Sequence, residues 1–158
     1  MNLLDACKWL ETTGISTGIR HSKWGFALIE MVHLVALALL GGALVITALR
    51  LFGLLFKAQR FEDVLRDLSW LFVGSLTAMI ASGVLLFADG PLRYYANVAF
   101  RWKLLFIGMA TGMGVVTHLI GMRGKSDVRG RLAVKVTACL SCAFFLGAAV
   151  AGRVIGVL

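Results

Sequence analysis

Residues 29–42 read IEMVHLVALALLGG, an apolar run in which a glutamate and a histidine stand near the start. The apolar stretch extends over about 24–52, which exceeds the roughly 20 residues that a helix needs to cross a hydrocarbon core of about 30 Å. Three more such stretches follow, at about 67–88, 101–122 and 132–156. The sequence therefore predicts an all-α integral membrane protein with four transmembrane helices.

The overall composition agrees with this prediction. Of the 158 residues, 59% are hydrophobic and 15% are charged, whereas soluble domains carry about 25% charged residues. No linker or repeat interrupts the chain, so we expect a single membrane domain over residues 1–158, folded as an up-down four-helix bundle. Small residues at four-residue spacing, among them Gly108 and Gly112, are predicted to mark contacts between helices.

The segment before the first span has a different pattern. Over about residues 2–20, apolar side chains recur at helical spacing among charged ones, which predicts a short amphipathic helix lying in the membrane interface. The segment lacks the apolar core and cleavage site of a signal peptide. Later in the chain, Cys139 and Cys142 form a Cys-x-x-Cys inside the fourth span, and we interpret both as packing residues.

Basic residues are unevenly distributed. Nine Lys and Arg lie on the side of the first and third loops and six on the other side, with Arg153 inside the fourth helix. Because basic residues resist translocation, this bias predicts that both termini face outward. The net charge of +8 is explained by contact with anionic lipids. Nucleic acid is excluded as a partner, because no basic stripe with interleaved aromatic residues lies outside the membrane.

Ionisable residues within the spans are candidates for function. Glu30 and His33 are three residues apart and share one face of the first helix. Arg153, near the end of the fourth helix, returns to the same level, so a Glu30 to Arg153 ion pair is predicted, with Lys103 as a second candidate partner. Two interpretations remain open: a structural clamp between helices, or the polar wall of a ligand pocket.

The spans contain two histidines, His33 and His118, and imidazole is a common ligand of haem iron and other metals. Counted from Trp24 and Arg101 as interface anchors, His33 lies 9 residues in and His118 lies 17. The difference corresponds to about 12 Å along parallel helices, which argues against one iron bound by both. Each histidine could instead serve a separate site, or hydrogen-bond across helices as a core residue.

Scattered polar positions carry a resemblance over nearly the whole chain. They are Glu30-x-x-His33, Leu49–Gly53, Asn97–Leu104, His118 and Ala151–Ile155. Together they resemble a family of small bacterial inner-membrane proteins of unknown function, which implies a multi-pass location in the inner membrane; the outward-facing termini predicted from the basic residues would then be periplasmic. Asn97 belongs to this pattern and joins the candidate cofactor-binding residues.

Histidines on a compact four-helix bundle also resemble, more loosely, the cytochrome b561-like and copper-resistance D-like membrane proteins. That resemblance implies haem b or copper, and electron transfer between a membrane quinol and a periplasmic partner. The chain has three histidines in all, too few for the four ligands of a two-haem carrier.

From these observations we predict a cofactor-binding membrane protein in electron transfer. His33 and His118 are the candidate haem or metal ligands, and Glu30, Lys103 and Arg153 form the polar wall. The alternative is a non-catalytic accessory subunit, without a cofactor, in a homo-oligomer or larger membrane complex. An enzyme acting alone is not indicated, because the spans contain neither a Ser-His-Asp set nor a second carboxylate for acid-base chemistry.

Overall fold

The computed structural model describes residues 3–122 and 128–155, and every regular element within these ranges is a helix. The long helices are α3 (Gly25–Leu51), α4 (Phe61–Asp89), α6 (Val98–Met122) and α7 (Val128–Ile155). All four are long and apolar enough to cross a membrane. This confirms the predicted all-α bundle and a multi-pass membrane protein whose exposed apolar side chains contact lipid.

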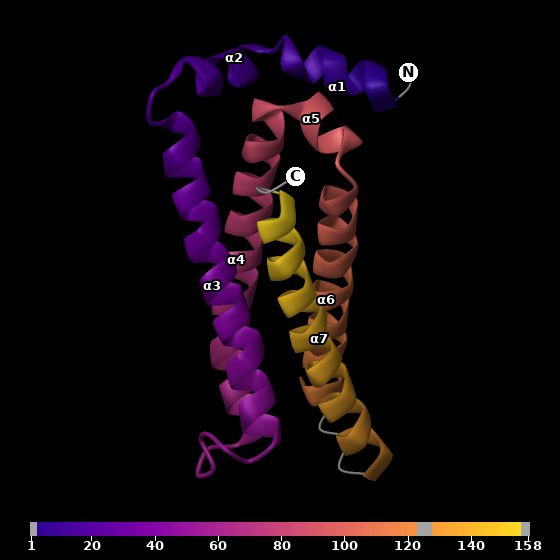
Figure 1. Cartoon of the computed structure of the whole chain (residues 1–158). Coiled ribbons are helices and arrows are strands. Elements are labelled where there is room, and N and C mark those ends of the chain that lie inside the picture. The colour runs from indigo at the N-terminus through magenta and orange to yellow at the C-terminus, as the bar shows by residue number, and fades with distance from the viewer. Residues whose placement is uncertain (1–2, 123–127, 156–158) are drawn as a thin grey trace.

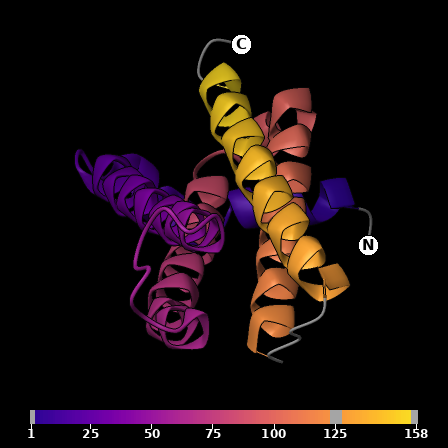
Figure 2. The same ribbon diagram turned by 90° about the horizontal axis from the view of Figure 1, so that it is seen from below.

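The four long helices run up and down (Figure 1) and associate as two pairs. α3 packs along α4, and α6 packs along α7, while α7 also contacts α3. Contact between α4 and α6 is much sparser. The view along the bundle shows the same two pairs, with α7 crossing α6 at an angle (Figure 2). A cavity lies beside this sparse α4/α6 junction.

The centre of the bundle is a small apolar core. Ala36, Leu40 and Met79 are buried within it, and Phe72 and Phe145 pack against them. Helices in lipid associate by close packing rather than by release of water, so small residues at such contacts let the backbones approach. Gly41 is one example, because a Cβ built there would lie 2.5 Å from Cε1 of Phe145 on α7.

Three short helices, α1 (Leu3–Glu11), α2 (Gly14–His21) and α5 (Pro91–Ala96), lie across one end of the bundle. We call this the capped end (Figure 1). Arg20 of α2 links the short helices to α4 through hydrogen bonds. Its Nε donates to the carbonyl oxygen of Asp89 at 2.8 Å. Its Nη2 donates to Glu11 Oε1 at 3.1 Å and to Ser16 Oγ at 2.9 Å. The last described turn of α7, which ends at Ile155, also lies toward the capped end (Figure 1). Which side of the membrane the capped end faces stays a prediction.

The helix boundaries differ from the expected ones in places. α4 begins at Phe61 rather than near residue 67, because its first turn is an amphipathic extension that the hydropathy pattern alone excludes. The predicted interfacial helix is two helices, and the predicted loop after α4 contains α5, with Pro91 in its first turn. Residues 2 and 156, which bound two of the predicted segments, lie outside the described residues.

The prediction that Gly108 and Gly112 mark a helix contact is wrong within this bundle. Nothing lies within 4 Å of a Cβ built on either glycine, so both face away from the neighbouring helices. The contact face of α6 carries Gly114 and Gly121 instead: a Cβ would lie 3.2 Å from Leu44 Cδ2 at the first and 2.8 Å from Leu65 Cδ2 at the second. Cys139, predicted to pack inside the bundle, is also exposed.

Candidate functional site

Each of the two histidines in the spans pairs with a serine of α4. His33 on α3 is bonded through Nδ1 to Oγ of Ser82 at 2.9 Å. His118 on α6 is bonded through Nε2 to Oγ of Ser69 at 3.1 Å. A single helix therefore holds both imidazoles, one near the capped end and one near the opposite end.

The two sites are far apart along the bundle. Ser82 and Ser69 are separated by 13 residues of α4 (82 − 69), or about 20 Å at 1.5 Å per residue. One iron cannot be bound by both His33 and His118 across this distance, as the depth argument predicted. Nor do the described residues contain a group of three or more His, Cys, Asp or Glu that could hold a metal ion.

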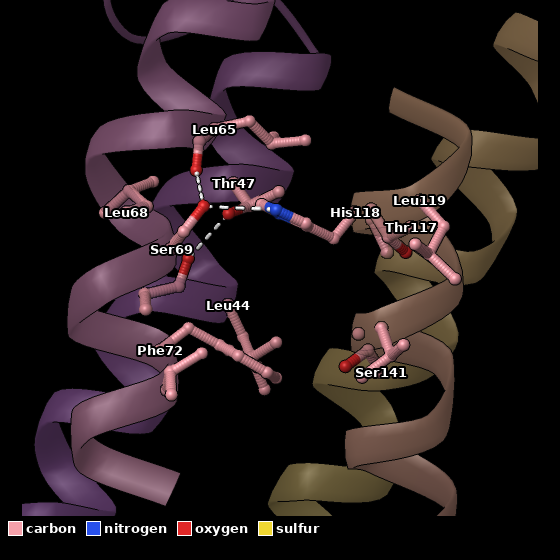
Figure 3. Close-up of a pocket in the computed structure, with 15 residues that line it drawn as sticks. Leu44, Thr47, Leu65, Leu68, Ser69, Phe72, Thr117, His118, Leu119 and Ser141 are labelled. Atoms are coloured by element: carbon pink, nitrogen blue, oxygen red, sulfur yellow. Dashed lines mark hydrogen bonds between the residues drawn. The ribbon is translucent and has the colours of Figure 1, made fainter. Parts of the chain in front are cut away.

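His118 lies at a cavity of about 140 Å³ whose walls come from all four long helices. Figure 3 shows its ring reaching from α6 toward Ser69 on α4, while apolar side chains surround the rest of the space. The main lining residues are Leu44, Thr47, Leu65, Leu68, Ser69, Phe72, Thr117, His118, Leu119 and Ser141. The lining is thus mainly apolar, and its polar side chains are His118 and four hydroxyl residues, Thr47, Ser69, Thr117 and Ser141.

The hydrogen bonds determine what His118 can offer a ligand. Ser69 donates its hydroxyl to the carbonyl oxygen of Leu65 at 2.7 Å, so the imidazole Nε2–H donates to Ser69 Oγ. Nδ1 of His118 is then a hydrogen-bond acceptor. Thr47 donates to the carbonyl oxygen of Ala43 at 2.8 Å, a local bond that a hydroxyl can exchange for a ligand atom.

The cavity opens toward lipid. Three of its lining residues are substantially exposed: Val73 on α4 by 55%, and Val115 and Leu119 on α6 by 41% and 51%. They flank the sparse α4/α6 junction, which faces the hydrocarbon when the four helices span a bilayer. A ligand would therefore enter sideways from the membrane rather than from water.

His33 has different surroundings. Its side chain is 8% exposed, and its Nε2 is buried with no hydrogen-bond partner. Ser82 donates its hydroxyl to the carbonyl oxygen of Ala78 at 2.6 Å, so His33 Nδ1 carries the proton of the bond to Ser82. Nε2 is therefore a bare acceptor, fixed in place by the bond on the other side of the ring.

Charged groups surround His33 at the capped end. The charges of Glu30 on α3 and Lys103 on α6 both act on the imidazole. The stem of Lys103 runs past Gly152 of α7, with Nζ 3.5 Å from the place of a glycine Cβ. Glu30 is exposed and Lys103 is half-buried. Glu30, His33 and Lys103 thus all lie toward the capped end, but no ion pair or hydrogen bond found within the described residues joins them.

Two other predicted site residues have different surroundings. The ion pairs found in the described part of the chain join Arg20 to Glu11 and Arg60 to Glu62, so the predicted Glu30 to Arg153 pair is absent there. Arg153 is exposed, which lets its charge reach the headgroup region.

Asn97 stands immediately before α6 and faces its first turn. Its Oδ1 accepts hydrogen bonds from the backbone N–H groups of Ala99 at 2.9 Å and Phe100 at 3.3 Å. This is the geometry of a helix N-cap, which satisfies donors that the first turn leaves open. The structure thus gives Asn97 a structural role in starting α6.

Comparison with known proteins places the chain in a family. The model of a family of unknown function, DUF6644, matches residues 8–158. The chain belongs to this family. No curated protein and no solved structure matches it, so the looser resemblance to cytochrome b561-like and copper-resistance D-like proteins gains no support.

Sequence reasoning missed Ser69 and Thr47 in this DUF6644 chain, and it missed that Ser82 bonds to His33. Ser75 and Ser82 are seven residues apart and share one face of α4, whereas Ser69, six residues before Ser75, lies about 120° around the helix. Because small hydroxyl residues often bond across helices in lipid, the presence of these serines inside the second span was a usable signal. Which serine meets which histidine follows only from the relative depth of the helices.

Proposed function

We propose that this DUF6644 chain is a membrane subunit that binds a lipid-soluble ligand with a ring-sized polar head, of which a quinone is the redox-active example. The site is the cavity beside His118. The single observation that carries the proposal is a mainly apolar cavity, beside the sparse α4/α6 junction, whose lining includes the polar side chains of His118, Ser69 and Thr47.

Size limits the ligand. An apolar cavity of about 150 Å³ in another protein binds one benzene ring. The cavity here, at about 140 Å³, accepts one six-membered ring and is much too small for a porphyrin. The apolar tail of the ligand would leave through the mouth beside Val73 and Val115, into the bilayer.

The polar groups suit both oxidation states of such a ring. A hydroquinone hydroxyl can donate to Nδ1 of His118, the acceptor left by the bond to Ser69. A quinone carbonyl can accept from Thr47, whose hydroxyl then leaves the carbonyl oxygen of Ala43. Because the rest of the lining is apolar, these bonds would orient the head.

In this proposal the chain takes part in electron transfer only together with a partner redox protein. The quinone would exchange electrons with another redox protein of the membrane or the periplasm, and the chain would supply the binding site. The proposal thus joins the predicted electron-transfer role to the predicted role as an accessory subunit of a larger complex.

The test is ligand-dependent stabilisation of the purified protein in nanodiscs of one lipid. A ligand that binds the native state raises the melting temperature with its concentration. We expect a benzoquinone with a decyl tail to give a saturable rise, and decylbenzene, which has the ring and tail without carbonyls, to give a much smaller one. Equal rises for the two compounds would contradict the proposal.

The serine beside His118 allows a matched pair of variants. Ser69→Ala removes the partner of His118, whereas Thr77→Ala removes a hydroxyl that bonds only to the carbonyl oxygen of Val73 on the exposed side of α4. We expect Ser69→Ala to weaken quinone binding about fivefold, the effect of about 1 kcal/mol for one hydrogen bond. Thr77→Ala should bind as the wild type does, and a loss of the same size in both variants would count against the site.

A further inference from the structure

The hydroxyl protons around the cavity beside His118 are already in use. Thr47 donates to the carbonyl oxygen of Ala43 at 2.8 Å, and Ser69 donates to that of Leu65 at 2.7 Å. Figure 3 shows the bond from Ser69 to Leu65 beside the bond that joins His118 to Ser69. Because a hydroxyl has one proton, Thr47 and Ser69 can donate to a ligand only by giving up these bonds.

The two other lining hydroxyls are bonded in the same way. Ser141 of α7, which is 1% exposed, donates to the carbonyl oxygen of Ala110 of α6 at 2.7 Å. Thr117 of α6 lies 2.8 Å from the carbonyl oxygen of Met113 and 2.8 Å from Oγ1 of Thr137, whose own proton goes to carbonyl oxygens of α7. The four hydroxyls therefore keep lone pairs for a ligand, whereas their protons are taken.

His118 adds a nitrogen acceptor to this lining. Its Nε2–H donates to Ser69 Oγ, so Nδ1 carries a lone pair. Nδ1 has no hydrogen bond within residues 3–122 and 128–155, yet it is not among the fully enclosed unpartnered atoms found there, which are His33 Nε2 and Arg50 Nε. Nδ1 of His118 thus keeps surface that a ligand can reach, unlike Nε2 of His33.

We propose that the cavity selects a ring that carries a hydroxyl donor, so that a hydroquinone binds more tightly than the corresponding quinone. This inference rests on the proposed function and names the reduced form as the preferred ligand. A hydroquinone O–H donates to Nδ1 of His118 and breaks no bond. A quinone carbonyl needs a donor, which Thr47 supplies only by leaving the carbonyl oxygen of Ala43. The hydroquinone therefore gains one hydrogen bond more, an advantage of about fivefold in affinity.

The experiment titrates the full chain in nanodiscs under nitrogen, which keeps the hydroquinone reduced. Four ligands with the same decyl tail are compared: a benzohydroquinone, a phenol, a benzoquinone and decylbenzene. We expect the hydroquinone to bind about fivefold more tightly than the quinone, and the phenol to bind more tightly than decylbenzene. A phenol as tight as the hydroquinone would support selection of any aromatic hydroxyl, and a weaker phenol would support selection of the hydroquinone itself.

Two outcomes would overturn the proposal, and they differ in what else they remove. A quinone that binds as tightly as the hydroquinone would refute the selection and leave the proposed function standing. If none of the three oxygen-containing compounds binds more tightly than decylbenzene, the proposed function fails and the selection fails with it.

A variant tests whether Nδ1 is the acceptor. His118→Phe keeps an aromatic ring at the cavity and should lower the hydroquinone affinity more than the quinone affinity, so that the preference falls below about twofold. Thr77→Ala is the control and should keep the full preference, because Thr77 is exposed and bonds to the carbonyl oxygen of Val73 on its own helix. A fivefold preference that survives in His118→Phe would refute the assignment to Nδ1. The comparison of the four compounds on the wild type does not depend on the folding of this variant.

Discussion

His33 and His118 lie near opposite ends of two parallel helices, and each is bonded to a serine of α4, yet the regions around them differ. His33 is buried at the capped end among charged groups, with one nitrogen left bare. His118 is half-buried at an apolar cavity that opens toward lipid. The difference teaches that two histidines bonded to the same helix can use different ring nitrogens and lie in different surroundings, near charged residues in one case and at an apolar cavity in the other.

The largest effect is expected where the two regions join. Gly41→Val places a side chain against Phe145, 2.5 Å from Cε1 at the Cβ, and so forces α3 and α7 apart. We expect the free energy of unfolding, measured by SDS titration from mixed micelles, to fall by about 2–3 kcal/mol. Gly112→Val is the matched control, because nothing lies within 4 Å of that Cβ. Equal losses of unfolding free energy in Gly41→Val and Gly112→Val would mean that the core between the two histidine regions is not packed at Gly41 as described.

A slightly smaller effect tests the capped-end histidine. Ser82→Ala leaves the N–H of His33 Nδ1 without its partner in a buried place, and should lower the free energy of unfolding by about 1–2 kcal/mol. Ser75→Ala is the control, since Ser75 is equally buried but bonds only to carbonyl oxygens of its own helix. The comparison between the two histidines would weaken if both serine variants lost the same amount.

Variants of Asn97 test whether this residue acts as the N-cap of α6 or as a ligand-binding residue. Asn97→Ala removes the acceptor for the first N–H groups of α6 and should lower the free energy of unfolding by about 1 kcal/mol in the same titration. Asn97→Asp keeps an acceptor oxygen and should retain nearly all of the stability. Loss of stability in the aspartate variant would indicate that the amide nitrogen, not the cap, is what matters there.

The smallest effect on stability is expected at the cavity. Ser69→Ala removes the partner of His118, but this ring is only half-buried and borders an open space, so it can turn. We expect a loss of about 0.5–1 kcal/mol in unfolding, below that of Ser82→Ala. A larger loss for Ser69→Ala than for Ser82→Ala would contradict the comparison, which depends on His33 being more buried than His118.

Much of the fold could be predicted from the sequence, because in lipid an apolar run of sufficient length has few alternatives to a spanning helix. The separation of His33 from His118 was also predictable, since depth along a helix follows from counting residues. The rotation of each helix about its own axis could not be predicted. Gly108 and Gly112 face outward, although their spacing is that of a contact stripe.

The candidate site was predictable only in part. Glu30, His33 and Lys103 were expected to gather because charged residues in a bilayer must face one another or a polar region. The predicted ion pair between Glu30 and Arg153 was wrong, because Arg153 is exposed and its long side chain can reach the headgroups. The cavity at Ser69 and Thr47 arises from the sparse α4/α6 contact, a property of the assembled bundle that no single helix encodes.

The central claim is that the two histidines serve separate sites, and one titration tests it directly. Binding of the decyl-tailed benzoquinone is measured in nanodiscs for the wild type, His118→Phe and His33→Gln. We predict that His118→Phe weakens binding about tenfold, because it removes both the acceptor and the bond to Ser69, while His33→Gln stays within about twofold of the wild type. Equal loss in the two variants would contradict the account and point to one shared site.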